Sequence, residues 1–316
     1  MDRSEDTAGV VAPLTRLVGL RHAAQGLALV PRREGQAPLA GPYSSAFRGR
    51  GIEFDEVRAY HPGDDVRHID WRVTARTGQV HSKVFQEERE QPVWVLLDVG
   101  PTLRFGTRRC FKSVAAAEAA ALVAWAAHLA GDRVGGVVLA PDGITCLTPR
   151  SGEGHLFSLL STLAAGTARP ADDLEHTPRL RDALSALRQR TRPGSRVFVI
   201  SDFDGLDEEA AALLVELQRR SDVSCVLVSD PLERTAPPPG RYRVSDGERV
   251  HAFSSQGVRW REAYESHFTD HRDRLAALCR PHTISLAELS TDDDPAAAIG
   301  LLLRPGQPTP ANRRAA

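Results

Sequence analysis

Three aspartates stand where short apolar runs end, and their carboxylates are the groups of this sequence best placed for chemistry. Asp98, Asp202 and Asp230 each directly follow a mainly apolar run. In open α/β sheets, ligands bind beyond the carboxyl ends of the strands, near the point where strand order reverses. Carboxylates that converge at such an edge suit a hard cation such as Mg²⁺. An aspartate after a strand is also a common turn former or helix cap, so both interpretations apply to each of the three.

The elements that must position these acids follow an alternating pattern. From residue 92 onward, apolar runs alternate with helical patterns, which predicts a mostly parallel sheet covered on both faces. Pro141-Asp142-Gly143 is a hairpin signal that adds one antiparallel edge strand. The predicted fold class is therefore α/β, a doubly wound and mostly parallel sheet. The expected strands are 93–98, 134–140, 144–149, 197–202, 223–229 and 283–289, and the expected helices are 111–130, 153–165, 178–190, 207–220, 258–278 and 295–303.

Composition shifts predict three regions along the chain. Residues 1–90 form an N-terminal extension of helix and short strands, whose first 12 residues are expected to be disordered. The sheet domain spans residues 91–303. Residues 304–316 carry Pro and Arg without an apolar pattern and are expected to form a flexible tail.

The composition argues against several classes of protein. The formal net charge of −1 gives no general case for binding nucleic acid or a membrane surface. The four cysteines include no Cys-x-x-Cys pair, which argues against a zinc knuckle and against a secreted disulfide scaffold. There is no signal-peptide pattern, and no run approaches the roughly 20 apolar residues that cross a bilayer. We therefore expect a cytoplasmic protein with no membrane span. Among the 40 basic residues, the only lysines are Lys83 and Lys112.

The loop after the first sheet strand resembles a known metal site. Asp98-Val99-Gly100-Pro101-Thr102 is similar to the Asp-x-Ser-x-Ser loop of von Willebrand factor A domains, which is part of their metal-ion-dependent adhesion site. Val199-Ile200-Ser201-Asp202 resembles the later strand that supplies the second Asp of that site. The resemblance implies a sheet domain of von Willebrand factor A type with its ligand site at the carboxyl ends of the strands.

A longer stretch resembles the bacterial domain-of-unknown-function 58 family. It includes Phe47-Arg48-Gly49-Arg50-Gly51-Ile52-Glu53-Phe54, Arg58-x-Tyr60-x-Pro62-Gly63-Asp64-Asp65-Val66-Arg67-x-Ile69-Asp70-Trp71, Ala75-Arg76, Glu87-x-x-Glu90, Phe105-Gly106 and Gly131-Asp132-Arg133-Val134-Gly135. Members of this family are commonly encoded beside MoxR-type AAA+ ATPases. The resemblance implies a non-enzymatic adaptor that binds proteins and acts with such an ATPase in the assembly or activation of other proteins.

The adhesion-type site departs from its pattern in this chain. Gly100 replaces a ligand serine, whereas Thr102 keeps a hydroxyl. The third element, a loop threonine, is either Thr177 or Thr167. Asp98, Thr102 and Asp202 are the predicted metal ligands, and Mg²⁺ would be held weakly or not at all. The same three residues, together with Asp204, are the predicted partner-binding residues.

Enzymatic alternatives rest on the same acids. A metal-dependent phosphoester hydrolase would use Asp98, Asp202 and Asp204, because two-metal hydrolysis needs clustered carboxylates. The loop also resembles the Asp-x-Asp-x-Thr motif of haloacid-dehalogenase phosphatases, but Gly100 stands where that motif has its second Asp. No phosphate-binding glycine loop is present, so we expect no nucleotide cofactor.

Two further polar groups are open to a structural or a functional interpretation. His267 and His271 lie four residues apart on an expected helix, which suits a pair of metal ligands, but their acidic and basic neighbours favour a solvated face. A polar block near the end of the extension either binds a metal or partner, or forms internal ion pairs with Trp71 packed beneath them. Its residues are Arg50, Glu53, Arg58, Asp64, Asp65, Arg67, Asp70, Trp71 and Arg76.

Overall fold

The computed structural model describes residues 9–27, 53–61, 66–86, 90–169, 178–245 and 250–303. The chain divides into two units, Arg33–Glu90 and the remainder, and each is described by itself. The predicted tail and several predicted site residues lie outside the described residues. They are residues 304–316, Arg50, Asp64, Asp65 and Thr177.

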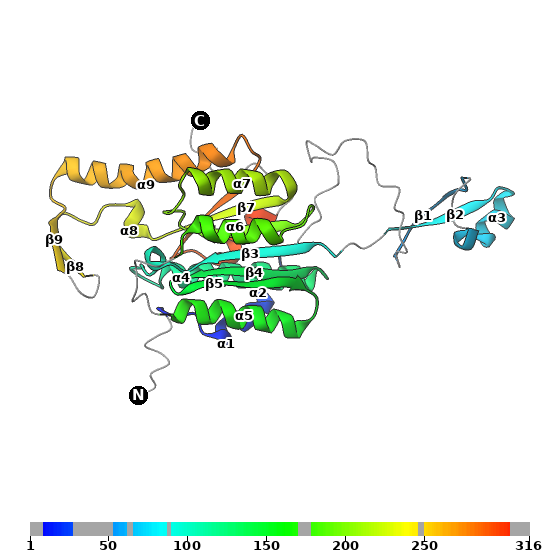
Figure 1. The fold of residues 1–316 in the computed structure, drawn as a ribbon, viewed down its shortest axis with the longest axis horizontal. Helices are drawn as coiled ribbons and strands as arrows, with labels where there is room; N and C mark the ends of the chain where they lie inside the picture. Colours follow the sequence, from blue (N-terminus) through cyan, green and yellow to red (C-terminus); the bar gives the residue numbers. More distant parts are fainter. Residues whose placement is uncertain are drawn as a thin grey trace. The chain divides into compact units, whose positions relative to one another are not determined.

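A six-stranded sheet forms the centre of the larger unit (Figure 1). Its strand order is β10-β7-β6-β3-β4-β5. All neighbouring strands are parallel except β4 and β5, which form the antiparallel hairpin at one edge. This arrangement confirms the predicted fold class. The strands are β3 (Pro92–Asp98), β4 (Arg133–Ala140), β5 (Gly143–Arg150), β6 (Arg196–Ser201), β7 (Asp222–Ser229) and β10 (Ser285–Ser290).

The strand order reverses between β3 and β6. After β3 the chain continues into β4 and β5 on one side, and then returns to pair β6 with the other edge of β3. Leu97 is the register partner of Ile200, so Asp98 and Ser201 lie at the same level of the sheet. Asp98 and Asp202 therefore flank the reversal point, where ligands of open α/β sheets bind.

Helices cover both faces of this sheet (Figure 1). One face carries α1, α2, α4, α5 and α10, and the other carries α6, α7 and α9. Within the described residues, no helix is both long and apolar enough to cross a membrane. The helices are α1 (Leu14–Gly19), α2 (Arg21–Ala24), α4 (Lys112–Leu129), α5 (Glu153–Ala168), α6 (Leu180–Arg190), α7 (Glu208–Arg220), α8 (Pro231–Arg234), α9 (Val258–Cys279) and α10 (Pro295–Leu303).

The buried strands divide their side chains between two apolar layers. In β3, Val95 and Leu97 join the layer beneath α4, whereas Trp94 and Leu96 join the layer beneath α6 and α7. This alternation follows from the two-residue period of a strand. Helix α4 is buried from Lys112 to Ala127, because further helices cover its outer side. Its many alanines suit that central position, since small side chains allow close packing on all sides.

The N-terminal segment packs on the sheet unit, which corrects two predictions. Residues 9–12 were expected to be disordered, yet the Phe111 amide donates to the Gly9 carbonyl at 2.7 Å, and the Ala12 amide donates to Oγ1 of Thr167 at 3.0 Å. Helices α1 and α2 were grouped with residues 33–90. Instead, Leu17 is fully buried in the layer around α4, and its carbonyl accepts a hydrogen bond from the Trp125 indole. Apolar burial thus places these helices with the sheet.

The smaller unit contains an antiparallel pair of strands and one short helix. Its elements are β1 (Glu53–Ala59), β2 (His81–Gln86), the 3₁₀ turn η1 (Val66–His68) and α3 (Trp71–Thr77). Asp70 caps α3 by accepting hydrogen bonds from the amides of Arg72 and Val73. The prediction that Trp71 packs beneath ion pairs is wrong, because Trp71 is 69% exposed. None of the residues of α3 is buried. Arg67 and Arg76 are also exposed.

A second hairpin lies ahead of the long helix α9. It consists of β8 (Arg241–Ser245) and β9 (Val250–Ser254). Rings from the hairpin and from α9 form a continuous stack, in the order Tyr242, Phe253, Trp260 and Tyr264, with centroid separations of 5.6, 5.3 and 5.1 Å. The stack fixes the hairpin to the beginning of α9.

Candidate functional site

The acid that ends β3 is buried and held by two hydrogen bonds. Oδ1 of Asp98 accepts from the amide of Gly100 at 2.9 Å, and Oδ2 accepts from the hydroxyl of Ser201 at 2.7 Å. Asp98 is only 7% exposed. Because Ser201 ends β6, this contact joins the two strands on either side of the reversal point.

Burial changes the acidity of this carboxyl. Burial, followed by the nearby charge of Asp202, raises the pKa of Asp98 to about 7. The hydrogen bonds from Ser201 and Gly100 and the charge of Lys112 lower the pKa, but they do not outweigh burial. The side chain is therefore an acid that exchanges its proton near neutral pH.

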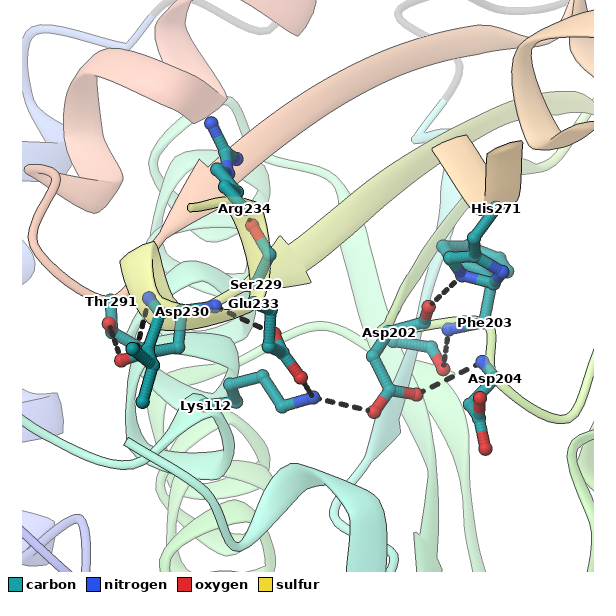
Figure 2. A network of polar contacts seen from close by, with 12 residues as sticks. Lys112, Asp202, Phe203, Asp204, Ser229, Asp230, Glu233, Arg234, His271 and Thr291 are labelled. Carbon is teal, nitrogen blue, oxygen red and sulfur yellow. Dashed lines mark hydrogen bonds and ion pairs between the residues drawn. The ribbon is translucent and has the colours of Figure 1, made fainter. Parts of the chain in front are cut away.

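Asp202, just beyond β6, is paired with a buried lysine (Figure 2). Nζ of Lys112 lies 3.0 Å from Oδ2 of Asp202 and 2.7 Å from Oε1 of Glu233. Burial lowers the pKa of Lys112, but the charges of Asp202 and Glu233 and their hydrogen bonds outweigh burial, so that the pKa is raised. Lys112 begins α4, where the helix dipole disfavours a cation. The two carboxylates offset that cost and keep the ammonium charged.

Asp230 connects the ends of β7 and β10. Its carboxylate accepts hydrogen bonds from the hydroxyls of Thr107 and Thr291, both at 2.6 Å, and from the amides of Thr107 and Leu232. Burial raises the pKa of Asp230, but these hydrogen bonds outweigh it, and the pKa is lowered. The Asp230 amide also donates to Glu233 at 2.8 Å (Figure 2). The sequence left open whether Asp230 binds a cation or caps a helix, and the structure makes it a helix cap that also joins two strand ends.

The backbone turns sharply after Asp202. Phe203 is fully buried with φ of 55°, a left-handed conformation that bulky residues rarely adopt. Its amide donates to Oγ of Ser201, and the carbonyl of Asp202 lies 2.8 Å from Nε2 of His271 on α9 (Figure 2). His271 was expected on a solvated face, but it is half-buried against this turn because α9 packs along β10.

Two of the predicted partner-binding residues are exposed at the same edge. Thr102 lies in the 3₁₀ turn η2 (Pro101–Leu103) that follows β3, and Asp204 follows the turn at Phe203. The amide of Asp204 donates to Oδ1 of Asp202, which leaves the Asp204 side chain directed away from that carboxylate (Figure 2). We define the strand-end rim as Asp98, Thr102, Asp202 and Asp204, the four residues that the sequence predicted to bind a partner. The structure brings all four to the carboxyl ends of β3 and β6.

The predicted threonine of an adhesion-type site is not found among the described residues. Thr167 is buried within α5, where its hydroxyl accepts from Ala12 and donates to the Ala164 carbonyl. Thr167 therefore serves the packing of the N-terminal segment. Thr177, the other candidate, lies outside the described residues.

The side chains at the rim do not fit a Mg²⁺ site. Lys112 occupies Oδ2 of Asp202, and an ammonium ion at that distance repels a second cation. Gly100 supplies no hydroxyl, and a Cβ there would lie 3.1 Å from Oδ1 of Asp98, closer than ordinary contact. Within the part of the chain that the structure describes, no three His, Cys, Asp or Glu side chains form a group that could hold a metal ion.

Sequence reasoning assigned no role in this site to four residues: Lys112, Ser201, Glu233 and His271. The first carried a usable signal, because a lysine is rare in this chain and heads a helix that is otherwise almost entirely apolar. Ser201 directly precedes Asp202 and was visible as part of the strand motif. Glu233 is the N3 residue of a capping box that begins at Asp230, a spacing that could have been read from the sequence.

Comparisons with known proteins agree with the pattern of motifs. The model of the family described as "Protein of unknown function DUF58" matches residues 56–274. The chain is 31% identical over 277 residues to Uncharacterized protein Rv1480 of Mycobacterium tuberculosis (strain ATCC 25618 / H37Rv), a match that covers 87% of this chain and 86% of that protein. Uncharacterized protein Mb1516 of Mycobacterium bovis (strain ATCC BAA-935 / AF2122/97) matches with the same identity and coverage.

Solved structures give weaker similarities. The conserved hypothetical protein BatB from Bacteroides thetaiotaomicron covers 67% of this chain and 96% of its own, with 14% sequence identity and a TM-score of 0.44. An aerotolerance-related membrane protein from Bacteroides fragilis NCTC 9343 has the same coverage and identity, with a TM-score of 0.40.

Proposed function

Since the chain belongs to the DUF58 family, we propose that it is a non-enzymatic adaptor that binds a protein partner at the strand-end rim. The first partner to test is a MoxR-type AAA+ ATPase, which the family resemblance implies. The adaptor would act in the cytoplasm, in the assembly or activation of other proteins.

One observation carries this proposal: the rim combines exposed polar side chains with a rigid buried support. Thr102 and Asp204 are exposed, whereas Asp98 and Asp202 are buried and hydrogen-bonded beneath them. Because these supporting groups are already fixed, this chain loses little conformational entropy when a partner docks. In this arrangement Thr102 and Asp204 contact the partner, and Asp98 and Asp202 hold the two loops in place.

The same geometry favours an adaptor over the alternative phosphoester hydrolase. Two-metal hydrolysis needs clustered carboxylates that are free to ligate and to clamp the attacking and leaving oxygens. Here one oxygen of Asp202 is bonded to Lys112 and the other to the amide of Asp204, and both oxygens of Asp98 accept hydrogen bonds. Both acids are therefore committed to holding the rim.

Site-specific crosslinking tests the adaptor function. A photoreactive amino acid would be placed at Asp204 in the full chain and irradiated in extracts of the source cells. Arg188 gives a matched control position, because it lies in the last turn of α6, shortly before β6 begins, and so is near the amino ends of the strands. Crosslinks to a MoxR-type ATPase from position 204 and not from position 188 would support the proposal. Equal labelling of that ATPase from both positions, or none from position 204, would count against it.

A further inference from the structure

We propose that Lys112 is a built-in cation, whose ammonium group stands where an adhesion-type site would hold its metal ion. The carboxylates beyond β3 and β6 are then neutralised without a divalent ion, and the rim binds its partner in a metal-independent way. This inference rests on the proposed function and deepens it, but its test needs no partner. The inference and the adaptor function can therefore be contradicted separately.

The position of the ammonium group supports this role. Nζ lies 3.0 Å from Asp202 and 2.7 Å from Glu233, and the side chain is 3% exposed. Asp98 is also close enough that the charge of Lys112 lowers its pKa. One positive charge therefore lies within hydrogen-bonding distance of two carboxylates, one just beyond β6 and one in α8, and its charge also acts on Asp98 at the end of β3.

The residue type supports the same role. The chain has 40 basic residues, of which only Lys83 and Lys112 are lysines. An ammonium ion is a compact charge with three donors, whereas a guanidinium is a broad planar fork. In the buried space between Asp202 and Glu233, the compact ion satisfies two separate carboxylates in the way that a small metal ion would.

The surrounding groups are incomplete as ligands while Lys112 is present. Mg²⁺ requires near-octahedral oxygen ligands at about 2.0–2.1 Å. Both oxygens of Asp202 are engaged, Gly100 contributes no side chain, and Thr102 is exposed on its turn. Removing the ammonium group would leave the carboxylates of Asp98, Asp202 and Glu233 buried or half-buried without their cation. We therefore expect Lys112→Ala to create a need for an added cation.

Divalent-ion binding by the purified full chain tests the inference. Uptake of Mn²⁺ is measured by the loss of the free-ion EPR signal, and the unfolding temperature is compared in millimolar Mg²⁺ and in EDTA. Wild-type protein and the distant control Arg188→Ala should bind no Mn²⁺ and unfold at the same temperature in both. Lys112→Ala should unfold earlier in EDTA, bind Mn²⁺, and gain about 5 °C in Mg²⁺. Adding Asp202→Asn to Lys112→Ala should abolish that gain.

Two results would overturn the inference. One is Mn²⁺ uptake by the wild type that Asp202→Asn removes, because the site would then hold a metal beside the lysine. The other is a folded Lys112→Ala protein that binds no divalent ion. If Lys112→Ala folds only in Mg²⁺, that result supports the inference. If it folds in neither condition, the wild-type Mn²⁺ measurement decides alone, with absence of uptake in favour and uptake against.

Discussion

Nζ of Lys112, at the start of α4, lies 3.0 Å from Oδ2 of Asp202, just beyond β6, and the two side chains are 3% and 8% exposed. The pair joins a helix and a strand end that are 90 residues apart in sequence. Through Glu233 it continues to Asp230, so that one polar chain links the ends of β6 and β7 (Figure 2). The stability of the rim therefore depends on a few buried charges.

Breaking this pair on one side should destabilise the protein strongly. Lys112→Met keeps the length of the side chain but leaves Asp202 buried without its cation, which costs about 3–5 kcal/mol in comparable pairs. Asp202→Asn introduced into the Lys112→Met protein removes the unpaired charge and should recover much of that loss. Urea unfolding at neutral pH measures both values. A double variant no more stable than Lys112→Met would contradict the assignment of the pair.

The acidity of Asp98 predicts the direction of a pH effect. Its pKa is raised to about 7 in the folded protein, above the ordinary value of 3.8, so the folded state binds the proton more tightly. Stability should therefore fall as pH rises from about 4 to 7, by up to ~4 kcal/mol for the full shift. Asp98→Asn should flatten this slope and be more stable than the wild type at pH ~8.

Ser201→Ala should change the pH dependence of stability in the opposite direction to Asp98→Asn. The Ser201 hydroxyl donates to Asp98 and lowers its pKa. Without that donor, the loss of stability should extend to higher pH than in the wild type. Urea unfolding at a series of pH values compares the three proteins. Equal slopes for wild type, Asp98→Asn and Ser201→Ala would show that Asp98 does not cause the pH effect.

Asp230 should matter more for stability than an ordinary helix cap. It accepts from two hydroxyls and two amides, so Asp230→Ala should cost about 2–4 kcal/mol. Asp207 caps α7 through a single amide hydrogen bond from Ala210, and Asp207→Ala should cost about 1 kcal/mol. Because the pKa of Asp230 is lowered, its contribution is present above pH ~4 and is lost as the pH falls through the lowered pKa. Similar costs for both variants at neutral pH would argue against the junction role.

Gly106 allows the loop that carries Thr107 to fold back on itself. A Cβ at position 106 would lie 2.1 Å from the carbonyl oxygen of Cys110, so Gly106→Ala should be destabilising by roughly 2 kcal/mol or more. Gly154, in the first turn of α5, has nothing within 4 Å of its Cβ position, and Gly154→Ala should be neutral or stabilising by up to about 1 kcal/mol. Thermal unfolding separates the two. A harmless Gly106→Ala would contradict the described close approach.

The sequence predicted the sheet and the location of the rim, because both depend on local patterns. Apolar runs gave the strands, and the Asp98 and Asp202 loops follow from where those runs end. Lys112 was not assigned to the site, because its reach to Asp202 depends on how α4 packs against the sheet. His271 was wrongly expected on a solvated face for a similar reason. Its charged neighbours in sequence do not determine which side of α9 packs against the turn after Asp202.

We propose that the strand-end rim binds the partner, and the affinity of the full chain for a MoxR-type ATPase from the same source tests this claim most directly. The dissociation constant would be measured in EDTA for wild type, for Asp204→Arg and for Arg188→Ala. Asp204 is exposed, so its substitution leaves the buried network intact. We predict that wild type and Arg188→Ala bind equally without a metal ion, and that Asp204→Arg binds at least about 10-fold more weakly, a change of ~1.4 kcal/mol. Equal affinity for all three proteins, or no binding by the wild type in either EDTA or Mg²⁺, would contradict the claim.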